Sequence, residues 1–340
     1  MIIVMKLRAS SEEVALVEAN VRALGYEPHT IRGEIRTVVA AVGDETTHQS
    51  LEALEAMSFV DRVVPIQKRY KLVSREIQDG TAIVRIGDLE IGNGTLHVIA
   101  GPCSVESLDQ TLSVARAVKQ SGATILRGGA FKPRTSPYDF QGLGEEALEI
   151  LQQAKAETGM PVISEVLRVS DIEMMTPMVD VFQIGARNGL NYALLEAVAA
   201  AGKPVFLKRG MMATIEEWLL AAEYIAKNGN PNIILCERGI RTFETATRNT
   251  LDISAVAIAK RESSLPVFVD PSHAAGRRDL LPDLAAAAIS AGADGLMIEV
   301  HNDPESAYSD QQQQLTTEMF EELMVSILPF IQASGLKPAW

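Results

Sequence analysis

A loop at residues 125–142, ILRGGAFKPRTSPYDFQG, gathers side chains suited to binding anions. Its functional groups are three cations and two hydroxyls: Arg127, Lys132, Arg134, Thr135 and Ser136. An arginine guanidinium grips phosphate or carboxylate oxygens through a planar fork, whereas a lysine ammonium acts as a point charge. The glycines and prolines between these groups disfavour helix and strand, so the segment is expected to be a shaped loop. A solvated basic loop is the simpler alternative, unless other parts of the chain supply groups to the same place.

Four residues from separate parts of the chain offer the side-chain atoms that metal ions bind: Cys103, His273, Glu299 and Asp310. Sulfur, nitrogen and oxygen ligands together suit borderline divalent ions such as Mn, Fe, Co or Zn. Each residue alone has a simpler interpretation, because a small cysteine is usually part of the core and a histidine can be a hydrogen-bonding loop residue. The second cysteine, Cys236, lies in an apolar run and is interpreted as core.

The elements that must position these residues alternate between short apolar runs and helical patterns from residue 96 onward. The expected strands are residues 96–100, 124–126, 162–165, 181–184, 205–208, 233–236, 267–270 and 296–300. The expected helices are residues 108–120, 145–158, 191–201, 215–228, 248–261 and 280–291. Apolar strands without alternation indicate parallel strands buried on both faces. About eight such units predict an α/β fold, a closed (β/α)₈ TIM barrel. An open doubly wound sheet is the alternative, but no glycine-rich dinucleotide fingerprint follows the first strand.

The barrel prediction brings the candidate residues together, because barrel active sites lie at the carboxyl ends of the strands. Nearly every expected strand ends in a functional side chain: Cys103, Arg127, Glu165, Arg187, Lys208, Arg238, His273 and Glu299. We therefore predict one convergent pocket rather than independent solvated charges. Its cations are sufficient for a substrate that carries both a phosphate and a carboxylate: Arg127, Lys132, Arg187, Lys208 and Arg238.

Residues 1–70 have a pattern of their own, in the order β-α-β-β-α-β, which predicts a ferredoxin-like α+β domain. Its second helix is expected over residues 46–57. This part shows no catalytic constellation, so we predict a regulatory or oligomerisation domain, with a purely structural appendage as the alternative. The charged residues 68–75 are the expected boundary. Residues 71–340 then form the barrel domain, which begins with a hairpin over residues 82–91.

The composition and net charge limit the classes of molecule that the protein is expected to bind. The 340 residues have a formal net charge of −13, which makes nucleic acid and anionic membranes unlikely partners. We find no apolar stretch near the roughly 20 residues that span a bilayer, and the first residues do not resemble a signal peptide. Two cysteines make no disulfide framework, so a reducing cytoplasm is expected.

Seven motifs, in order along the chain, resemble those of the 3-deoxy-D-arabino-heptulosonate 7-phosphate (DAHP) synthases of type Iβ. They are GPCSVES (101–107), KPRTSPYDFQG (132–142), QIGARN (183–188), LKRG (207–210), CERGIRTFE (236–244), DPSHAAGRR (270–278) and MIEVH (297–301). The resemblance covers about residues 78–332. This branch also includes the 3-deoxy-manno-octulosonate 8-phosphate (KDO8P) synthases. Residues 1–70 resemble, less closely, the ferredoxin-like regulatory extension of some members.

The resemblance implies a reaction: phosphoenolpyruvate condenses with erythrose 4-phosphate and water, giving DAHP and phosphate, the first step of the shikimate pathway. The metal positions of the family match Cys103, His273, Glu299 and Asp310, where the ion would polarise the aldehyde. The phosphoenolpyruvate site matches Arg127, Lys132, Glu165, Arg187, Lys208 and Arg238. The aldose phosphate site matches Arg134, Thr135 and Ser136. Lys132 lies between the two sites as a candidate proton donor, and with Cys103 and His273 it makes up the expected catalytic set. A homotetramer and an aromatic amino acid effector are also implied.

The sequence departs from this family after Asp310, where members commonly have a small residue and then a proline. Here Gln311 to Gln314 follow, so Asp310 is the least secure ligand.

KDO8P synthase, which uses arabinose 5-phosphate, is the nearest alternative function. The intact KPRT run at residues 132–135 favours erythrose 4-phosphate, because the other branch typically alters it. A ligand-sensing barrel without catalysis is a further alternative, but it would not need a complete set of metal ligands.

Overall fold

The computed structural model describes residues 1–33, 36–43, 51–64, 69–78, 80–134 and 136–340. Two compact units are present: residues 1–80 with 262–264, and residues 81–261 with 265–340. The domain boundary at residue 70 stays a prediction. Among the described helices, we find none whose length and apolar character would let it cross a bilayer.

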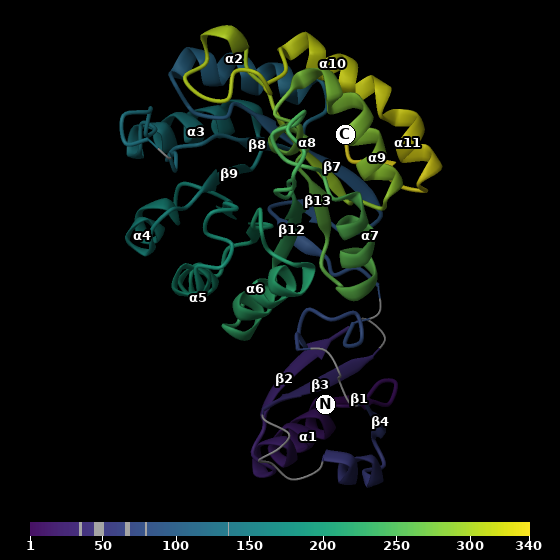
Figure 1. Cartoon of the computed structure of the whole chain (residues 1–340). Coiled ribbons are helices and arrows are strands. Elements are labelled where there is room, and N and C mark those ends of the chain that lie inside the picture. Colours follow the sequence, from purple (N-terminus) through teal and green to yellow (C-terminus); the bar gives the residue numbers. More distant parts are fainter. Residues whose placement is uncertain (34–35, 44–50, 65–68, 79, 135) are drawn as a thin grey trace. The chain divides into compact units, whose positions relative to one another are not determined.

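The first unit is a four-stranded antiparallel sheet of the ferredoxin-like kind (Figure 1). Its elements are β1 (Ile2–Met5), α1 (Ser11–Ala23), β2 (Glu27–Arg32), β3 (Thr37–Val42), the 3₁₀-helix Leu51–Ala56 and β4 (Val60–Val64). The sheet order is β2-β3-β1-β4, so the two central strands are β3 and β1. The second helix expected over residues 46–57 is a 3₁₀-helix in its described part, and residues 46–50 lie outside the described residues.

Alternation along β1 sends its side chains to two different cores. Ile3 and Met5 pack in one cluster with Val14 and Val17 of α1. Ile2 and Val4 point to the opposite face and belong to a second cluster. Both faces of this small sheet are therefore covered by apolar side chains.

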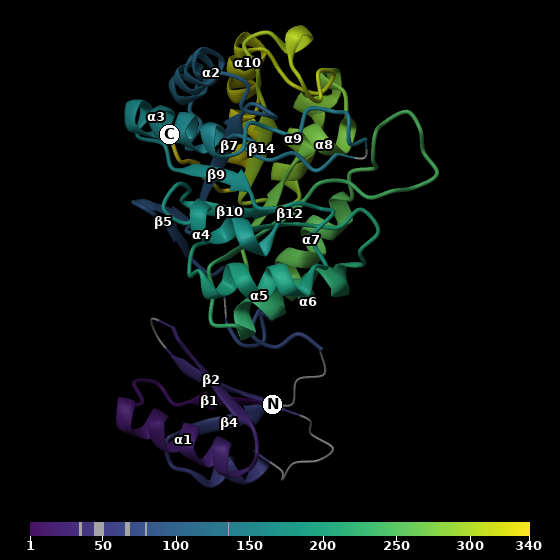
Figure 2. The same ribbon diagram turned by 90° about the vertical axis from the view of Figure 1, so that its left-hand side faces the viewer.

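The second unit is a closed barrel of eight parallel strands (Figures 1 and 2). The strands are β7 (Thr95–Gly101), β8 (Ile125–Arg127), β9 (Val162–Glu165), β10 (Val181–Ile184), β11 (Val205–Lys208), β12 (Ile233–Glu237), β13 (Val267–Val269) and β14 (Gly295–Glu299). They pair in sequence order, and β14 pairs with β7 to close the ring. The predicted (β/α)₈ fold is confirmed.

Helices form the outer layer of this barrel, and several short helices follow strand ends. They are α2 (Leu108–Gln120), α3 (Glu145–Thr158), α4 (Ile172–Met175), α5 (Tyr192–Ala200), α6 (Ile215–Lys227), α7 (Ile253–Glu262), α8 (Pro271–Ala275), α9 (Leu281–Ser290), α10 (Thr317–Ser326) and α11 (Leu328–Ala333). The 3₁₀-helices of this unit are Val169–Asp171, Arg278–Leu280 and Pro304–Ser306. A two-residue strand, β15 (Lys337–Pro338), pairs with the start of β7.

The hairpin of β5 (Val84–Ile86) and β6 (Leu89–Ile91) closes one end of the barrel interior. Its side chains Val84, Ile86 and Ile91 share a core with residues such as Ile125 and Val181, which begin their strands. The apolar side chains of the hairpin therefore fill the barrel interior at the amino ends of the strands. The carboxyl ends are left for polar groups, where a barrel active site is expected.

Candidate active site

The four predicted metal ligands converge at the carboxyl ends of β7, β13 and β14. Cys103, Glu299 and Asp310 each bring one ligand atom to a place where these atoms lie within 4.8 Å of one another. The fourth residue, His273, has its Nε2 3.4 Å from Glu299 Oε1 and 3.9 Å from Asp310 Oδ2. A thiol, an imidazole and two carboxylates at this spacing could hold a divalent ion of the borderline class.

Asp270 fixes the orientation of His273. Its Oδ2 lies 2.7 Å from His273 Nδ1, and its Oδ1 accepts a hydrogen bond of 2.9 Å from the His273 backbone N–H. Burial lowers the pKa of the imidazole, which favours the neutral ring. Because the carboxylate can only accept, Nδ1 carries the proton and Nε2 presents its lone pair to the other ligands. The sequence analysis assigns no role to Asp270, although its position three residues before His273 is compatible with a contact between the two.

The Asp270 carboxylate has a second buried partner, the ammonium of Lys208. Burial alone would raise the pKa of Asp270, but His273 and Lys208 hold it well below its ordinary value. Both side chains of the Lys208–Asp270 pair are almost completely buried. The predicted substrate cation Lys208 is therefore held by the residue that orients a predicted metal ligand.

Cys103 is a buried thiol at the end of β7. Burial, together with the charge of Glu299, raises the pKa of this thiol to about 12. Lys132 Nζ lies 2.9 Å from Cys103 Sγ and 3.0 Å from the Cys103 carbonyl oxygen. A thiol binds metal as the thiolate, so the Cys103 proton must leave when a cation binds.

Glu299 forms a buried ion pair with Arg127 across the barrel mouth. Burial opposes its ionisation, but the cations Arg127 and Lys132 hold the pKa of Glu299 well below its ordinary value. The Glu299 side chain thus carries a negative charge, and Arg127 is anchored beside it.

The predicted phosphoenolpyruvate residues surround Glu165. Arg127, Lys132 and Glu165 line one small pocket together with Gln183, whose Nε2 donates to Glu165 Oε2 at 3.3 Å. Burial raises the pKa of Glu165, and the opposing cations are Lys132, Lys208, Arg127 and Arg187. Arg187 is exposed. Gln183 belongs to the QIGARN motif, but the sequence offered no sign of its contact with Glu165.

Arg238, the remaining predicted cation, is buried at the end of β12. Its guanidinium donates to the backbone carbonyl oxygens of Gly239 and His273, each at 3.4 Å. The structure therefore brings Arg238 to α8, the short helix that carries His273.

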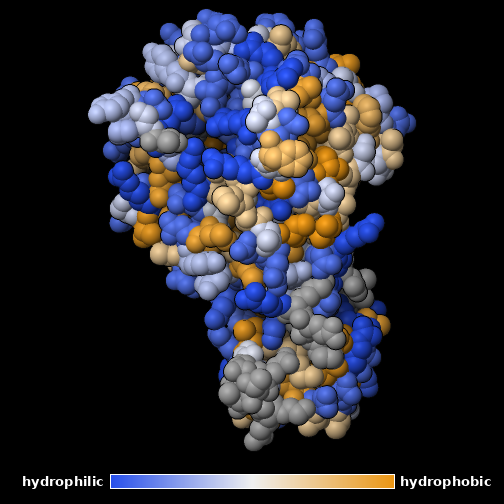
Figure 3. All heavy atoms as spheres, in the orientation of Figure 1, coloured by the Kyte–Doolittle hydropathy of each residue, from blue (hydrophilic) through white to orange (hydrophobic). Residues whose placement is uncertain are grey.

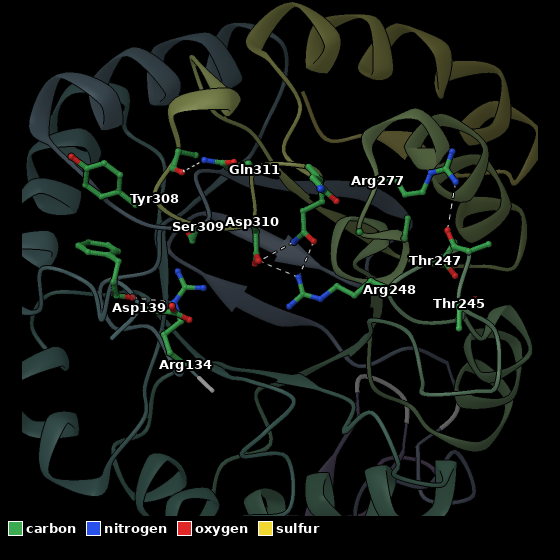
Figure 4. Close-up of a pocket in the computed structure, with 17 residues that line it drawn as sticks. Arg134, Asp139, Thr245, Thr247, Arg248, Arg277, Tyr308, Ser309, Asp310 and Gln311 are labelled. Carbon is green, nitrogen blue, oxygen red and sulfur yellow. Dashed lines mark hydrogen bonds and ion pairs between the residues drawn. The ribbon is translucent and has the colours of Figure 1, made fainter. Parts of the chain in front are cut away.

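A larger pocket of about 680 Å³ opens beside the ligand cluster. Its charged lining includes Arg134, Arg248, Arg277 and Asp310, and hydrophilic side chains gather over this face of the barrel between α3 and α8 (Figures 3 and 4). Arg134 is held there by a hydrogen bond of 3.0 Å from its Nε to the Phe140 carbonyl oxygen.

Of the two hydroxyl residues predicted next to Arg134, the structure describes only Ser136. Ser136 is half-buried and its Oγ accepts a hydrogen bond of 3.2 Å from the backbone N–H of Tyr138. It is not among the residues that line the larger pocket. Thr135 lies outside the described residues.

Arg248 and Gln313 contact the predicted metal ligands, and sequence reasoning missed both contacts. Arg248 Nη1 points across the pocket to Asp310 Oδ1 at 3.2 Å (Figure 4). The same nitrogen donates to Gln313 Oε1 at 2.9 Å. The prediction considered residues at the ends of strands, and neither Arg248 nor Gln313 directly follows a strand. Nothing in a run of glutamines indicates that one of them contacts a residue at a strand end.

Two family models match the chain. The model described as DAHP synthetase I family matches residues 46–328, and the model described as DAHP synthase ferredoxin-like domain matches residues 1–68. The chain is 48% identical over 337 residues to a phospho-2-dehydro-3-deoxyheptonate aldolase of Thermotoga maritima, and the match covers 99% of both proteins. It is 31% identical over 273 residues to a 2-dehydro-3-deoxyphosphooctonate aldolase of Desulfosudis oleivorans, covering 75% of this chain and 97% of that protein.

Two solved structures of DAHP synthases are also similar to this chain. The crystal structure of the Thermotoga maritima phospho-2-dehydro-3-deoxyheptonate aldolase (DAHP synthase) has a TM-score of 0.79 at 47% identity, covering 99% of this chain and 98% of that one. A truncated form of the 3-deoxy-D-arabino-heptulosonate 7-phosphate synthase from the same organism has a TM-score of 0.74 at 49% identity, covering 79% of this chain and 99% of that one.

Proposed function

The chain belongs to the DAHP synthetase I family, and we propose that it joins phosphoenolpyruvate to erythrose 4-phosphate, consuming water and releasing DAHP and phosphate. The observation that carries this conclusion is the 48% identity over almost the whole length of a DAHP synthase, ferredoxin-like domain included. Similarity to the octonate aldolases is lower and covers about three quarters of the chain. KDO8P synthesis is therefore the second candidate.

A divalent metal ion bound by Cys103, His273, Glu299 and Asp310 is part of this proposal. The fit rests on the convergence of their ligand atoms and on the Asp270 contact that leaves His273 Nε2 free to coordinate. When bound, the ion supplies Lewis acidity that polarises the aldehyde carbonyl of the aldose. Mn, Fe, Co and Zn suit this ligand set.

The cations at the strand ends bind phosphoenolpyruvate in this account. Its carboxylate and phosphate lie against Arg127, Lys132, Arg187, Lys208 and Arg238, with Glu165 among them. Two of these cations are already fixed by buried carboxylates, Arg127 by Glu299 and Lys208 by Asp270. Preset charges of this kind orient the substrate and stabilise the phosphate as it leaves, with little reorganisation during the reaction.

Lys132 is the proton donor of this proposal. Burial would lower the pKa of its ammonium, but the charge of Glu299 and the hydrogen bond to Cys103 Sγ carry it above the ordinary value, so the group holds its proton. As C3 of phosphoenolpyruvate forms a bond to the aldehyde carbon, Lys132 gives its proton to the aldehyde oxygen. Water then adds at C2 and gives up one proton, which restores the Lys132 ammonium. The C2 hydroxyl becomes the ketone as the bond from C2 to the phosphate oxygen breaks, and its proton leaves with the phosphate. Lys132 lines the small pocket, and Arg134 of the same loop lines the larger one, which supports a position of Lys132 between the two substrates.

The aldose phosphate occupies the larger pocket, where Arg134 provides a charge for its phosphate. Thr135 and Ser136 complete this subsite in the proposal. Asp310, a proposed metal ligand, lines the same pocket, which supports a binding mode with the aldehyde end of a short aldose near the metal.

The experiment is a phosphate-release assay on the metal-stripped protein. With phosphoenolpyruvate and erythrose 4-phosphate, adding Mn²⁺ is expected to start phosphate release together with formation of the heptulosonate. Phosphate release without the aldose, or equal rates with and without metal, would contradict the proposal.

The ferredoxin-like domain is proposed to be regulatory, with an aromatic amino acid as effector. Deleting residues 1–70 should leave turnover in place and remove inhibition by tyrosine or phenylalanine. Inhibition that persists in the truncated protein would place the effector site in the barrel. No inhibition of the intact protein would favour a structural role for the domain.

A homotetramer in the cytoplasm completes the proposal and is supported by the family resemblance alone. Light scattering of the purified protein tests the assembly, and a mass near that of a monomer would contradict it.

A further inference from the structure

We infer that Gln313 and Gln314 are positioning residues that hold three of the four proposed metal ligands in place. This inference rests on the metal site of the proposed function. Both side chains are buried, 2% and 0% exposed, although they belong to a run of four glutamines. Burial of two amides in a loop that follows a strand indicates that their polar atoms have partners.

Gln313 connects both carboxylate ligands. Its Nε2 donates to Glu299 Oε2 at 2.5 Å and lies 3.5 Å from Asp310 Oδ2. Its Oε1 accepts from Arg248 Nη1 at 2.9 Å. These partners fix the orientation of the amide, because a guanidinium can only donate and a carboxylate can only accept. Gln313 thus links Glu299, at the end of a strand, to Asp310 in the following loop.

A neutral donor is suited to this place. Two anionic ligands repel each other, and an amide N–H group orients a carboxylate without cancelling the charge that the metal needs. Glu299 already has one cationic partner, Arg127, on its other oxygen. A second cation in the position of Gln313 would compete with a divalent ion for the same carboxylate.

Gln314 supports the thiol ligand. Its Oε1 accepts a hydrogen bond of 3.0 Å from the backbone N–H of Cys103, and its Nε2 donates to the Ser309 carbonyl oxygen at 2.8 Å. Cys103 follows the first barrel strand, and Ser309 directly precedes Asp310. One side chain therefore ties two ligand segments that are about 200 residues apart in sequence.

The backbone of Asp310 needs this support. Its φ of 49° lies in the left-handed region, which aspartate adopts more readily than most residues but still uncommonly. The turn after it is held by a hydrogen bond of 3.3 Å from the Gln313 backbone N–H to the Asp310 carbonyl oxygen. The glutamine run thus stands where members of the family commonly have a small residue and a proline, and it contacts Asp310 through the Gln313 side chain.

The test is a titration of the metal-stripped full-length protein with Co²⁺, followed by absorption. Thiolate coordination gives a near-ultraviolet charge-transfer band, and the visible bands report the ligand geometry. Removing the amides with Gln313→Leu or Gln314→Leu should weaken Co²⁺ binding roughly 10- to 100-fold and shift the visible bands. Gln312→Leu is the matched control from the same run, because Gln312 is exposed, and its Co²⁺ affinity should equal that of the unmodified protein.

If Gln313→Leu does not fold, Gln313→Asn provides a second test of the same contact. It keeps an amide but is one methylene shorter, so it cannot span Arg248 and Glu299 together, and weaker binding is again expected. Unchanged affinity and spectra in the folded Gln313 and Gln314 variants would overturn the inference. If the unmodified protein shows no charge-transfer band with Co²⁺, the metal site of the proposed function fails instead.

Discussion

Replacing Asp270 with asparagine should destabilise the barrel more than any loss of a surface charge. The carboxylate is fully buried and serves Lys208, the His273 ring and the His273 backbone N–H. The amide of Asp270→Asn is nearly the same size, so no cavity forms. The ammonium of Lys208, however, is left in the interior without a counter-charge. Breaking a buried pair in this way costs about 3–5 kcal/mol of unfolding free energy.

Three further variants separate the effect of charge from the effect of shape: Asp279→Asn, Lys208→Met, and Lys208→Met together with Asp270→Asn. Asp279→Asn removes the carboxylate of an exposed pair with Arg277, and little change in stability is expected because solvent screens such pairs. Lys208→Met combined with Asp270→Asn removes both charges. This double variant should lose less stability than the two single variants added together, because neither partner is left buried alone.

Urea unfolding followed by tryptophan fluorescence is the assay. The chain has two tryptophans, Trp218 and Trp340, and both lie in the barrel unit, so the signal reports that unit. The reasoning is refuted if Asp270→Asn costs no more than Asp279→Asn. It is also refuted if the double variant loses the full sum of the two single effects.

Three further predictions concern other residues. Cys103→Ala should abolish metal-dependent phosphate release while far-ultraviolet circular dichroism stays unchanged, and full activity in this variant or after chelation would exclude the metal role of the thiol. Burial raises the pKa of Glu165 above its unfolded value of about 4.3, so the folded, ligand-free protein keeps this proton longer and loses stability as pH rises through the folded pKa. Glu165→Gln should therefore become progressively more stable than the unmodified protein as pH rises from about 4 to neutral, and parallel pH profiles of unfolding would contradict this. Thr214 caps α6 by accepting from the Glu217 backbone N–H, so Thr214→Ala should lower the urea unfolding free energy of the barrel by about 1 kcal/mol, whereas Thr214→Ser should lower it much less.

Much of the barrel could be predicted because its strands are short apolar runs with clear ends. The strands at residues 162–165, 181–184 and 205–208 were predicted with the bounds that the structure has. The helix expected over residues 145–158 also has these bounds in the structure, where Gly159 ends it in the left-handed conformation. Periodicity and helix-ending residues are local signals, so the sequence is sufficient for these elements.

The helix expected from residue 248 begins at Ile253, and the reason is tertiary. The backbone N–H of Asn249 donates to Ala274, and Thr250 pairs with Ile240. Contacts with the loops after two other strands thus hold these residues in an extended path, although the helical pattern continues through them. No local pattern reports such partners.

In the candidate site, too, some residues could be predicted from local sequence and others depend on tertiary contacts. The types and positions of Cys103, His273 and Glu299 could be predicted because they follow strands whose ends must meet. The roles of Asp270 and Gln313 could not, since they depend on which side chain lies within 3 Å once the barrel has closed. The residues at strand ends were visible in the sequence, and the residues that orient them were not.

The most direct test of the central claim compares the two aldose phosphates. Purified protein with Mn²⁺ and phosphoenolpyruvate would be given erythrose 4-phosphate or arabinose 5-phosphate, and kcat/KM would be measured from phosphate release. The proposed function predicts a much higher kcat/KM with erythrose 4-phosphate. An equal or higher value with arabinose 5-phosphate would contradict it.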